Sequence, residues 1–306
     1  MKDKIFRYYN RKMQKNSNFL FRDVLTTPPA ETDPSSPTIL FSALNNVNCR
    51  AYILAAKSFL FFYPKVAVVI QDDGDLDDRS ISELRSHIQG VTIYSKESMF
   101  RAIRETMSED VKKVMPPESE YDLYTPIRIL YLKCLNVIAR FPNKKVIFLD
   151  SDMLFLKCPD AILEWIKESS DRIFYGEGGS YLAETFHTIG FEFNNLDIAN
   201  FNSGLLGLCG TVSHAHLAAV LKKIYDYDPL IFHEWEVEQS IWAVLLANRE
   251  NPINLDSLKD VYIGSGWRSY RDLKENAVVA HFVGAIRFKN FRYLRLARDV
   301  IKKLKN

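Results

Sequence analysis

Two aspartates, Asp150 and Asp152, directly follow a run of apolar residues at 146–149 (VIFL). A strand without charge is usually buried on both faces, as in a parallel sheet covered by helices. Ligand sites in open α/β sheets lie at the carboxyl ends of such strands, and two carboxylates one residue apart can both bind one divalent cation. The pair therefore predicts a site for Mg²⁺ or Mn²⁺, which could neutralise a diphosphate and make it a better leaving group. The plain alternative is a pair of acids that caps the next turn.

The pattern of apolar residues predicts the elements that must position this pair. We expect strands at 39–44, 66–70, 91–94, 146–149 and 277–280, and helices at 50–62, 80–88, 126–140 and 288–304. Ser80 and Glu83 have the spacing of a capping box at the start of a helix. The alternation of strands and helices predicts an α/β fold with a mostly parallel sheet flanked by helices.

Residues 26–38 (TTPPAETDPSSPT) form a Pro- and Ser-rich connector that can be neither a helix nor a central strand. We therefore expect three parts. A basic N-terminal extension and this connector occupy 1–38, one large α/β domain occupies 39–287, and a basic amphipathic helix occupies 288–306. One large α/β domain can reach this size.

The composition is that of a globular protein. Of the 306 residues, 47% are hydrophobic and 25% are charged, which excludes a disordered or collagen-like chain. The 40 Lys and Arg residues nearly balance the 38 Asp and Glu residues, so bulk charge predicts no nucleic-acid partner. Four cysteines without CxxC pairs, a polar N-terminal stretch and the lack of an apolar run long enough to span a bilayer predict reduced thiols and a cytoplasmic protein.

The segment 288–304 has an apolar stripe at helical spacing, with basic residues mostly on its other faces. The apolar positions are Phe288, Phe291, Leu294, Ala297, Ile301 and Leu304. Two interpretations remain open. The stripe packs on the domain while the charges are solvated, or the helix makes peripheral contact with an anionic membrane surface.

Three further motifs follow Asp152 along the chain. Residues 200–206 (NFNSGLL) join a turn of small residues to an apolar strand, Glu238-Gln239 opens an apolar helix, and residues 281–287 (HFVGAIR) follow a strand. Together with residues 149–152 (LDSD), and in this order, they resemble the glycogenin-like family of retaining glycosyltransferases, which includes bacterial lipopolysaccharide galactosyltransferases. That family has LDaD, FNSG, an Asp-Gln pair and HFxGxxK, so the resemblance covers residues 149–287.

The resemblance implies a GT-A fold and a metal site made by Asp150, Asp152 and His281, a carboxylate and imidazole set that suits Mn²⁺. It implies that Gly284 lets the backbone approach the diphosphate. Arg287 stands where the family has Lys, which keeps the positive charge and adds a bidentate fork for phosphate. The plain alternative for His281 is a core histidine whose hydrogen bonds are satisfied.

The resemblance also implies that Glu238, in place of the family's Asp, and Gln239 lie near the anomeric carbon, and that Asn202 touches the sugar or the acceptor. Alternatively, Asn202 only forms a turn. The other candidates for binding the donor are Ala43 and Asn45 at the end of the first strand, Ser151, Gly204 and, on the helix before the DxD strand, Lys133 with Arg128 as the alternative.

The implied function is metal-dependent transfer of a sugar from a nucleotide diphosphate sugar, with a UDP-sugar expected, to a hydroxyl of a glycan or glycolipid acceptor, with retention. One alternative is a haloacid-dehalogenase-like phosphatase with Asp150 as nucleophile and Asp152 as general acid. That family expects Thr or Val at the position of Leu154 and an acidic pair downstream, whereas the pairs at 72–73 and 77–78 lie upstream. A non-catalytic nucleotide-sugar-binding protein and a nucleotidyltransferase also stay open, although residues 44–50 lack the Gly-rich signature of the latter.

Two other clusters have simpler interpretations. Asp72 and its acidic neighbours suggest a calcium loop, but Asp78 occupies the position that needs Gly and Leu84 the one that needs Glu, so we expect a turn before a helix. His214 and His216 would point apart on a helix, and the residues that follow are helical in pattern, so we expect a helix start and not a zinc site.

Overall fold

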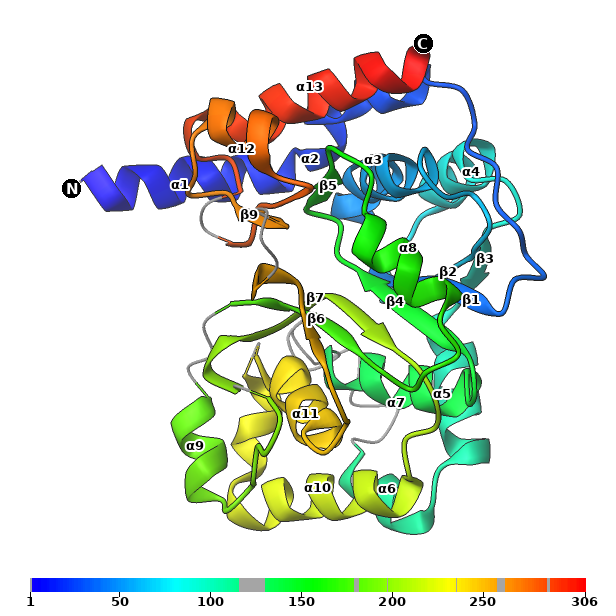
Figure 1. Cartoon of the computed structure of the whole chain (residues 1–306), viewed down its shortest axis with the longest axis vertical. Helices are drawn as coiled ribbons and strands as arrows, with labels where there is room; N and C mark the ends of the chain where they lie inside the picture. The colour runs from blue at the N-terminus through cyan, green and yellow to red at the C-terminus, as the bar shows by residue number, and fades with distance from the viewer. Residues whose placement is uncertain are drawn as a thin grey trace. The chain divides into compact units, whose positions relative to one another are not determined.

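The computed structural model of the chain describes residues 2–115, 130–178, 182–196, 198–234, 236–257, 262–284 and 287–306 (Figure 1). The chain divides into two compact units. Unit 1 consists of Met1–Ile93, Leu149–Glu168 and Leu255–Asn306, and unit 2 consists of Tyr94–Phe148 and Ser169–Asn254. Each unit has its own strands and helices.

The first strands of unit 1 are neighbours in one sheet, in which β1 and β2 form a mostly buried parallel pair. In spatial order they are β3 (Thr92–Tyr94), β2 (Ala67–Asp72) and β1 (Thr38–Leu44). Ile39 lies opposite Ala67 and Leu44 opposite Asp72 in the parallel pair. The helices that follow β1 and β2 are α3 (Cys49–Leu60) and α4 (Asp78–His87). Every side chain of α3 is buried, so this helix forms the interior of the unit.

A second sheet of unit 1 has three strands. In spatial order they are β5 (Met153–Phe155), β10 (Val279–His281) and β9 (Ile263–Ser265). β10 is antiparallel to β5 and parallel to β9. Two short helices and a 3₁₀ turn complete this part: α8 (Asp160–Lys167), α12 (Tyr270–Asn276) and η7 (Leu255–Ser257).

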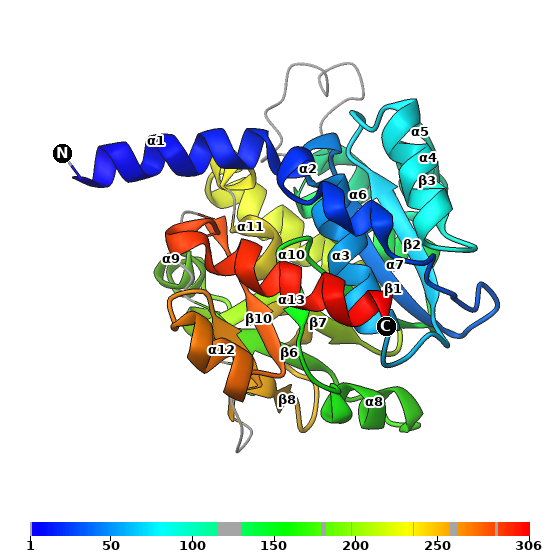
Figure 2. The same cartoon turned by 90° about the horizontal axis from the view of Figure 1, so that it is seen from above.

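Both ends of the chain are helical and belong to unit 1 (Figure 2). The N-terminal elements are α1 (Lys2–Lys15), α2 (Ser17–Leu20) and η1 (Arg22–Thr26), and the C-terminal ones are η9 (Lys289–Phe291) and α13 (Arg292–Lys305). α2 packs on α3 and on η2 (Asn46–Asn48), and α13 packs on η1, α3 and β5. No element was expected before residue 39, so these N-terminal helices are a finding of the structure.

The C-terminal helix buries its apolar face, although not in the register that we expected. Its buried residues are Tyr293, Leu296, Ala297, Val300 and Ile301. Phe291 precedes the helix at a φ of 55° and is 59% exposed, so its place in the apolar stripe was wrong. The interpretation that this face packs on the protein is confirmed, and the membrane contact stays a prediction. Within the described part of the chain, no helix is both long and apolar enough to cross a bilayer.

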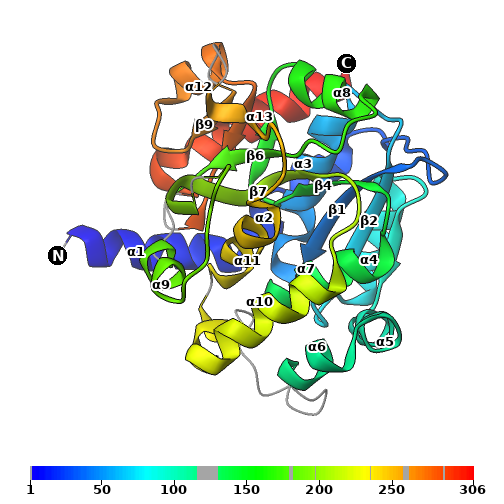
Figure 3. The same ribbon diagram turned by 60° about the horizontal axis from the view of Figure 1, so that its bottom comes forward.

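Unit 2 contains a second set of strands and most of the remaining helices (Figure 3). In spatial order its strands are β4 (Lys145–Leu149), β7 (Phe201–Leu208), β6 (Phe174–Glu177) and β8 (Ile253–Asn254). Its helices are α5 (Lys96–Thr106), α6 (Glu109–Val114), α7 (Leu130–Arg140), α9 (Ala183–Thr188), α10 (His214–Tyr227) and α11 (Val237–Leu246), with 3₁₀ turns η5 (Ile198–Asn200) and η6 (Pro229–His233).

The core of unit 2 is built around α11, all of whose residues are buried. This helix packs on α7 and β7, and Trp242 meets Phe148 edge to face at 5.4 Å between ring centroids. β6 pairs with β7 antiparallel and with β8 parallel. The predicted α/β class, with a mostly parallel sheet flanked by helices, is confirmed.

The capping box expected at Ser80 is wrong. α4 begins at Asp78, and Asp77 is its N-cap, whose carboxylate accepts the Ser80 N–H at 2.7 Å. Asp77 is a strong N-cap residue, and the Glu83 carboxylate is engaged by Arg50 at 2.6 Å instead of reaching back to the helix start.

Other predictions from the sequence are confirmed. His216 lies in the first turn of α10 and its N–H bonds to the Ser213 side chain at 3.3 Å, so this is a helix start. The four cysteines are free.

Candidate functional site

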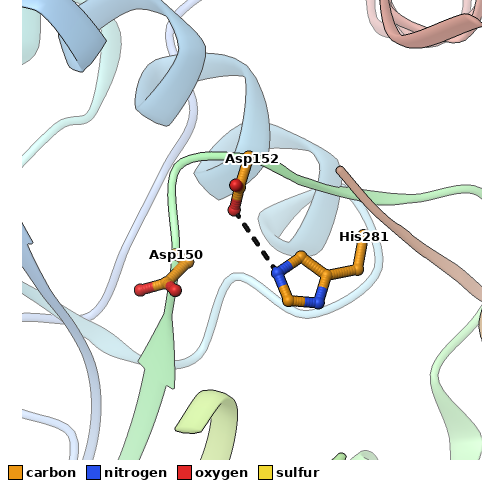
Figure 4. A group of neighbouring side chains, drawn as sticks. All are labelled: Asp150, Asp152 and His281. Carbon is orange, nitrogen blue, oxygen red and sulfur yellow. Dashed lines mark ion pairs between the residues drawn. The ribbon is translucent and has the colours of Figure 1, made fainter. Parts of the chain in front are cut away.

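The three predicted metal ligands meet in unit 1 because of how two strands pair. Asp150 directly follows β4, Asp152 directly precedes β5, and His281 ends β10. The antiparallel register sets His281 opposite Met153, and the N–H of Phe282 donates to the Asp152 carbonyl at 3.0 Å. One ligand atom from each of Asp150, Asp152 and His281 lies within 4.8 Å of the other two (Figure 4).

The surroundings of the buried His281 imidazole indicate whether these residues fit a cation. Its Nε2 atom has no hydrogen-bond partner among the described residues, and Asp152 Oδ1 lies 3.6 Å away. Asp152 is 4% exposed and His281 7% exposed, whereas Asp150 is partly exposed. A buried polar atom without a partner costs free energy, which a cation shared with two carboxylates would relieve. The donor set therefore fits a divalent cation such as Mn²⁺.

Arg287 is bonded to the same cluster. Its Nη2 atom donates to Asp152 Oδ2 at 2.6 Å, Nη1 donates to Asn48 Oδ1 at 2.9 Å, and Nε donates to the Phe282 carbonyl at 3.4 Å. Burial by itself lowers the pKa of the guanidinium, but the charge of Asp152 raises it, and the net result is a raised pKa. A fixed positive charge thus lies beside the candidate metal ligands.

The end of β1 is connected to Arg287 through Asn48, a residue that the sequence analysis missed. Asn45 Oδ1 accepts hydrogen bonds from the backbone N–H of Asn48 at 3.2 Å and from its side-chain amide at 2.9 Å. Ala43 lies in β1 opposite Gln71. The three asparagines at 45–48 signal a turn in the sequence, but no local pattern shows which one reaches Arg287.

The turn between the two aspartates is fixed from the C-terminal helix. The hydroxyl of Tyr293 donates to the carbonyl of Ser151 at 2.8 Å, and its ring stacks on Phe282 at 4.6 Å between centroids. Burial raises the pKa of Tyr293 well above its usual value, so this hydroxyl stays a donor. Tyr293 was also missed, because its side chain looks like any other buried position of an amphipathic helix.

Glu238 of unit 2 is the centre of a separate buried cluster. Its Oε2 atom accepts a hydrogen bond from Ser203 at 2.8 Å, and its Oε1 atom lies 3.8 Å from Lys133 Nζ. The side chains of Lys133 and Glu238 are 6% and 8% exposed, and the Lys133 ammonium lies 5.0 Å from the centroid of Phe148. Burial, followed by the charge of Glu238, raises the pKa of Cys134, so this thiol stays protonated.

The other candidate residues of unit 2 are sequence neighbours of Ser203 and Glu238. Asn202 Oδ1 accepts the N–H of Gly204 at 2.9 Å, a local turn bond that also fits its plain interpretation. Gln239 is 6% exposed, and its Nε2 atom has no hydrogen-bond partner among the residues that the structure describes.

The remaining predictions concern loops. Gly284 has a φ of 48°, and an added Cβ would meet nothing within 4 Å, so its backbone is open to a ligand. The expected turn near Asp72 is present, because Asp72 Oδ1 accepts the N–H of Gly74 at 2.7 Å and that of Leu76 at 3.2 Å. Arg128 lies outside the described residues.

No protein-family model and no curated protein matches this chain. Solved structures do match it. The apo form of mouse xyloside xylosyltransferase 1 has 14% identity and a TM-score of 0.48, and the match covers 80% of this chain and 96% of that one. Core-mannan synthase A from Aspergillus fumigatus, in an Mn/GDP form, has 9% identity and a TM-score of 0.47 over 72% of each chain. The galactosyltransferase LgtC, with donor and acceptor sugar analogues, has 15% identity and a TM-score of 0.45 over 86% and 95%. The chain is thus distantly similar to solved sugar transferases.

Proposed function

We propose that this protein is a metal-dependent glycosyltransferase that moves a sugar from a nucleotide diphosphate sugar, a UDP-sugar, to a hydroxyl of a glycan or glycolipid acceptor. The observation that carries the proposal is the cluster of Asp150, Asp152 and His281, whose ligand atoms lie within 4.8 Å of one another and whose buried imidazole nitrogen has no hydrogen-bond partner in the described part of the chain. Mn²⁺ or Mg²⁺ would bind there and, when bound, would supply positive charge that makes the donor's diphosphate a better leaving group.

Arg287 and Gly284 supply the protein's own part of the diphosphate site. A guanidinium has five N–H donors, more than the three that bond Asp152, Asn48 and Phe282 among the described residues. The two N–H donors of Arg287 that have no partner among the described residues would bind phosphate oxygens. Gly284 would expose its backbone to the diphosphate, because nothing stands where a side chain would.

We further propose that the transfer retains the anomeric configuration. The bond from the anomeric carbon to the diphosphate oxygen breaks, the bond to the acceptor oxygen forms on the same face, and the acceptor's proton passes to the leaving diphosphate. Glu238 and Gln239 would stabilise the positive charge that develops on the sugar. Anomeric NMR of the product tests this step, and an inverted linkage would contradict it.

A phosphatase is less well supported by the same site. In that mechanism Asp152 would donate a proton as general acid, yet its carboxylate accepts a hydrogen bond from the Arg287 guanidinium at 2.6 Å. A non-catalytic nucleotide-sugar-binding protein has the same donor site, so turnover must separate the two. Slow, metal-dependent release of UDP from a UDP-sugar would support the transferase, and release of phosphate from a phosphomonoester would support the phosphatase.

Binding of the donor nucleotide is the first test. Thermal shift with UDP, GDP and CDP, each with and without Mn²⁺, should show stabilisation that is largest for UDP with Mn²⁺, because a ligand that binds only the folded state raises its stability. Asp150→Asn should abolish the Mn²⁺-dependent part. Asp110→Asn is the matched control, since it removes an exposed carboxylate that pairs with Lys113 on α6. An unchanged response of Asp150→Asn would contradict the proposed metal site.

A further inference from the structure

The N-terminal helices contact the candidate donor site through a buried asparagine. Asn10 of α1 is 5% exposed, and its amide nitrogen donates to the Gly284 carbonyl at 3.3 Å. Its amide oxygen accepts the N–H of Phe288 at 3.3 Å. One side chain therefore bonds both Gly284 and Phe288, which lie on either side of Arg287 in the sequence. Gln14, one turn further along α1, donates to the same Gly284 carbonyl at 3.2 Å.

A second asparagine of the same extension holds the loop after β1. Asn18 of α2 donates to the Asn46 carbonyl at 2.6 Å and accepts the N–H of Arg50 at 3.0 Å. In turn, Arg50 Nη1 donates to the Asn18 carbonyl at 2.8 Å, and Arg50 Nη2 pairs with the Glu83 carboxylate. One side chain thus bonds the backbone of both Asn46 and Arg50 within the segment 45–50.

These two segments, residues 284 and 287–288 in one and 45–50 in the other, are linked to each other by the bond from Arg287 Nη1 to Asn48 Oδ1. The first contains Gly284 and Arg287, which the proposed function places on the diphosphate, and the second contains Asn45, which the sequence analysis predicts to bind the donor. Loops that bind ligands lose affinity when they must be ordered on binding, so bonds that hold them beforehand favour binding. A displacement of the Gly284 carbonyl would also move the neighbouring Arg287, whose N–H lies 3.3 Å from it.

We infer that the N-terminal helices are a working part of the donor site, in which Asn10 and Asn18 are positioning residues that hold the two loops around a nucleoside diphosphate. The inference rests on the proposed function, because it assigns the bound ligand from it. Neither asparagine touches the ligand. Each acts through the backbone of the loop that it holds, and the two lie far from those loops in sequence but in the same compact unit.

The test is binding of UDP with Mn²⁺ by calorimetry to the full chain and to Asn10→Ala and Asn18→Ala. Loss of the two hydrogen bonds that each asparagine side chain makes to a loop predicts a Kd about three- to tenfold weaker for each variant. Asn16→Ala is the matched control from the same extension, because its side chain bonds the Lys12 carbonyl of α1 at 2.8 Å and no other residue that the structure describes. That variant should bind like the parent protein.

A cycle with Arg287→Ala separates positioning from a general loss of structure. If Asn10 acts through Arg287, Asn10→Ala should weaken UDP binding much less in the Arg287→Ala background than in the parent. Asn10→Asp provides a second variant of the same shape, which keeps the acceptor for Phe288 but cannot donate to Gly284 when ionised, and it should also weaken binding.

The inference would be overturned if Asn10→Ala and Asn18→Ala bound UDP as tightly as the parent protein. It would also be overturned if Asn10→Ala weakened UDP binding as much in the Arg287→Ala background as in the parent. Neither result would contradict the proposed function. Absence of nucleoside diphosphate binding in the parent protein would overturn the proposed function and the inference with it.

Discussion

The guanidinium of Arg287 lies 2.6 Å from the carboxylate of Asp152, the same residue whose other carboxylate oxygen lies 3.6 Å from the buried Nε2 of His281. Asp152 is therefore shared between a fixed cation of the protein and the place where a metal would bind. The pair balances the charge of a carboxylate that is only 4% exposed, and a bound divalent cation would provide a second compensating charge.

Replacement of Arg287 should make the stability of the protein depend on the metal. Arg287→Ala leaves the Asp152 carboxylate buried without its partner, which typically destabilises a protein by about 3–5 kcal/mol. Mn²⁺ should recover part of this loss, so its effect on Tm should be larger in Arg287→Ala than in the parent. Arg287→Lys should keep most of the stability, because it keeps the charge but loses the fork. Equal Mn²⁺-induced shifts in Tm for the parent and Arg287→Ala would argue against a cation at Asp152.

His281→Phe should separate metal binding from folding. The substitution keeps an aromatic ring but removes a buried nitrogen that has no hydrogen-bond partner in the described structure, so the metal-free Tm should not fall. Affinity for Mn²⁺, measured by electron paramagnetic resonance, should fall at least about tenfold. Loss of a residue that only supports a metal ligand already costs about that much, and His281 would be a ligand itself. His216→Phe on α10 is the control and should leave Mn²⁺ affinity unchanged. Parent-like Mn²⁺ binding by His281→Phe would exclude the imidazole as a ligand.

The sequence predicted the position of Asp150 and Asp152 after a buried strand, because that signal is local: an apolar strand and two acids at its carboxyl end. The strands and helices around them follow from local patterns in the same way. His281 is different, since it reaches the pair only through the antiparallel register of β10 with β5, and only the ordered resemblance of the motifs pointed to it.

The contacts that the sequence could not predict are long-range bonds of ordinary polar residues. Asn10 and Gly284 are 274 residues apart, and Asn10 looks like any other asparagine in a basic segment. The capping box at Ser80 failed for a related reason, because Glu83 is taken by Arg50 from another helix. Phe291 was misplaced because the helix begins only after a residue with positive φ, which a pattern of apolar spacing does not reveal.

Removal of one partner of the buried pair of Lys133 and Glu238 should strongly destabilise the protein. Lys133→Met removes the buried cation that lies 3.8 Å from the Glu238 carboxylate, which is 8% exposed, so urea denaturation should show a loss of about 3–5 kcal/mol. Adding Glu238→Gln removes the charge that Lys133 balanced and should restore part of that loss. A double variant as unstable as the sum of the single variants would show that the two side chains do not interact.

Lys57 should make the protein more stable as the pH rises from about 8 to about 10.5. Its ammonium is buried, 1% exposed, where it donates to Thr27 Oγ1 at 2.7 Å and lies 3.1 Å from His87 Nδ1, with no carboxylate among its described partners. Burial lowers the pKa of Lys57 from 10.5 to about 8. Between these values the unfolded chain binds more protons than the folded one, so the free energy of unfolding rises with pH, by on the order of 3 kcal/mol across the window. Buried tyrosines such as Tyr52, whose pKa is raised by burial, ionise near the upper end of this window only in the unfolded chain and so also change the stability there. The measurement is therefore the difference between the parent and Lys57→Met in urea denaturation at pH 8, 9 and 10. The free energy of unfolding of the parent minus that of Lys57→Met should rise with pH. A difference that stays constant would mean that Lys57 keeps its ordinary pKa in the folded protein.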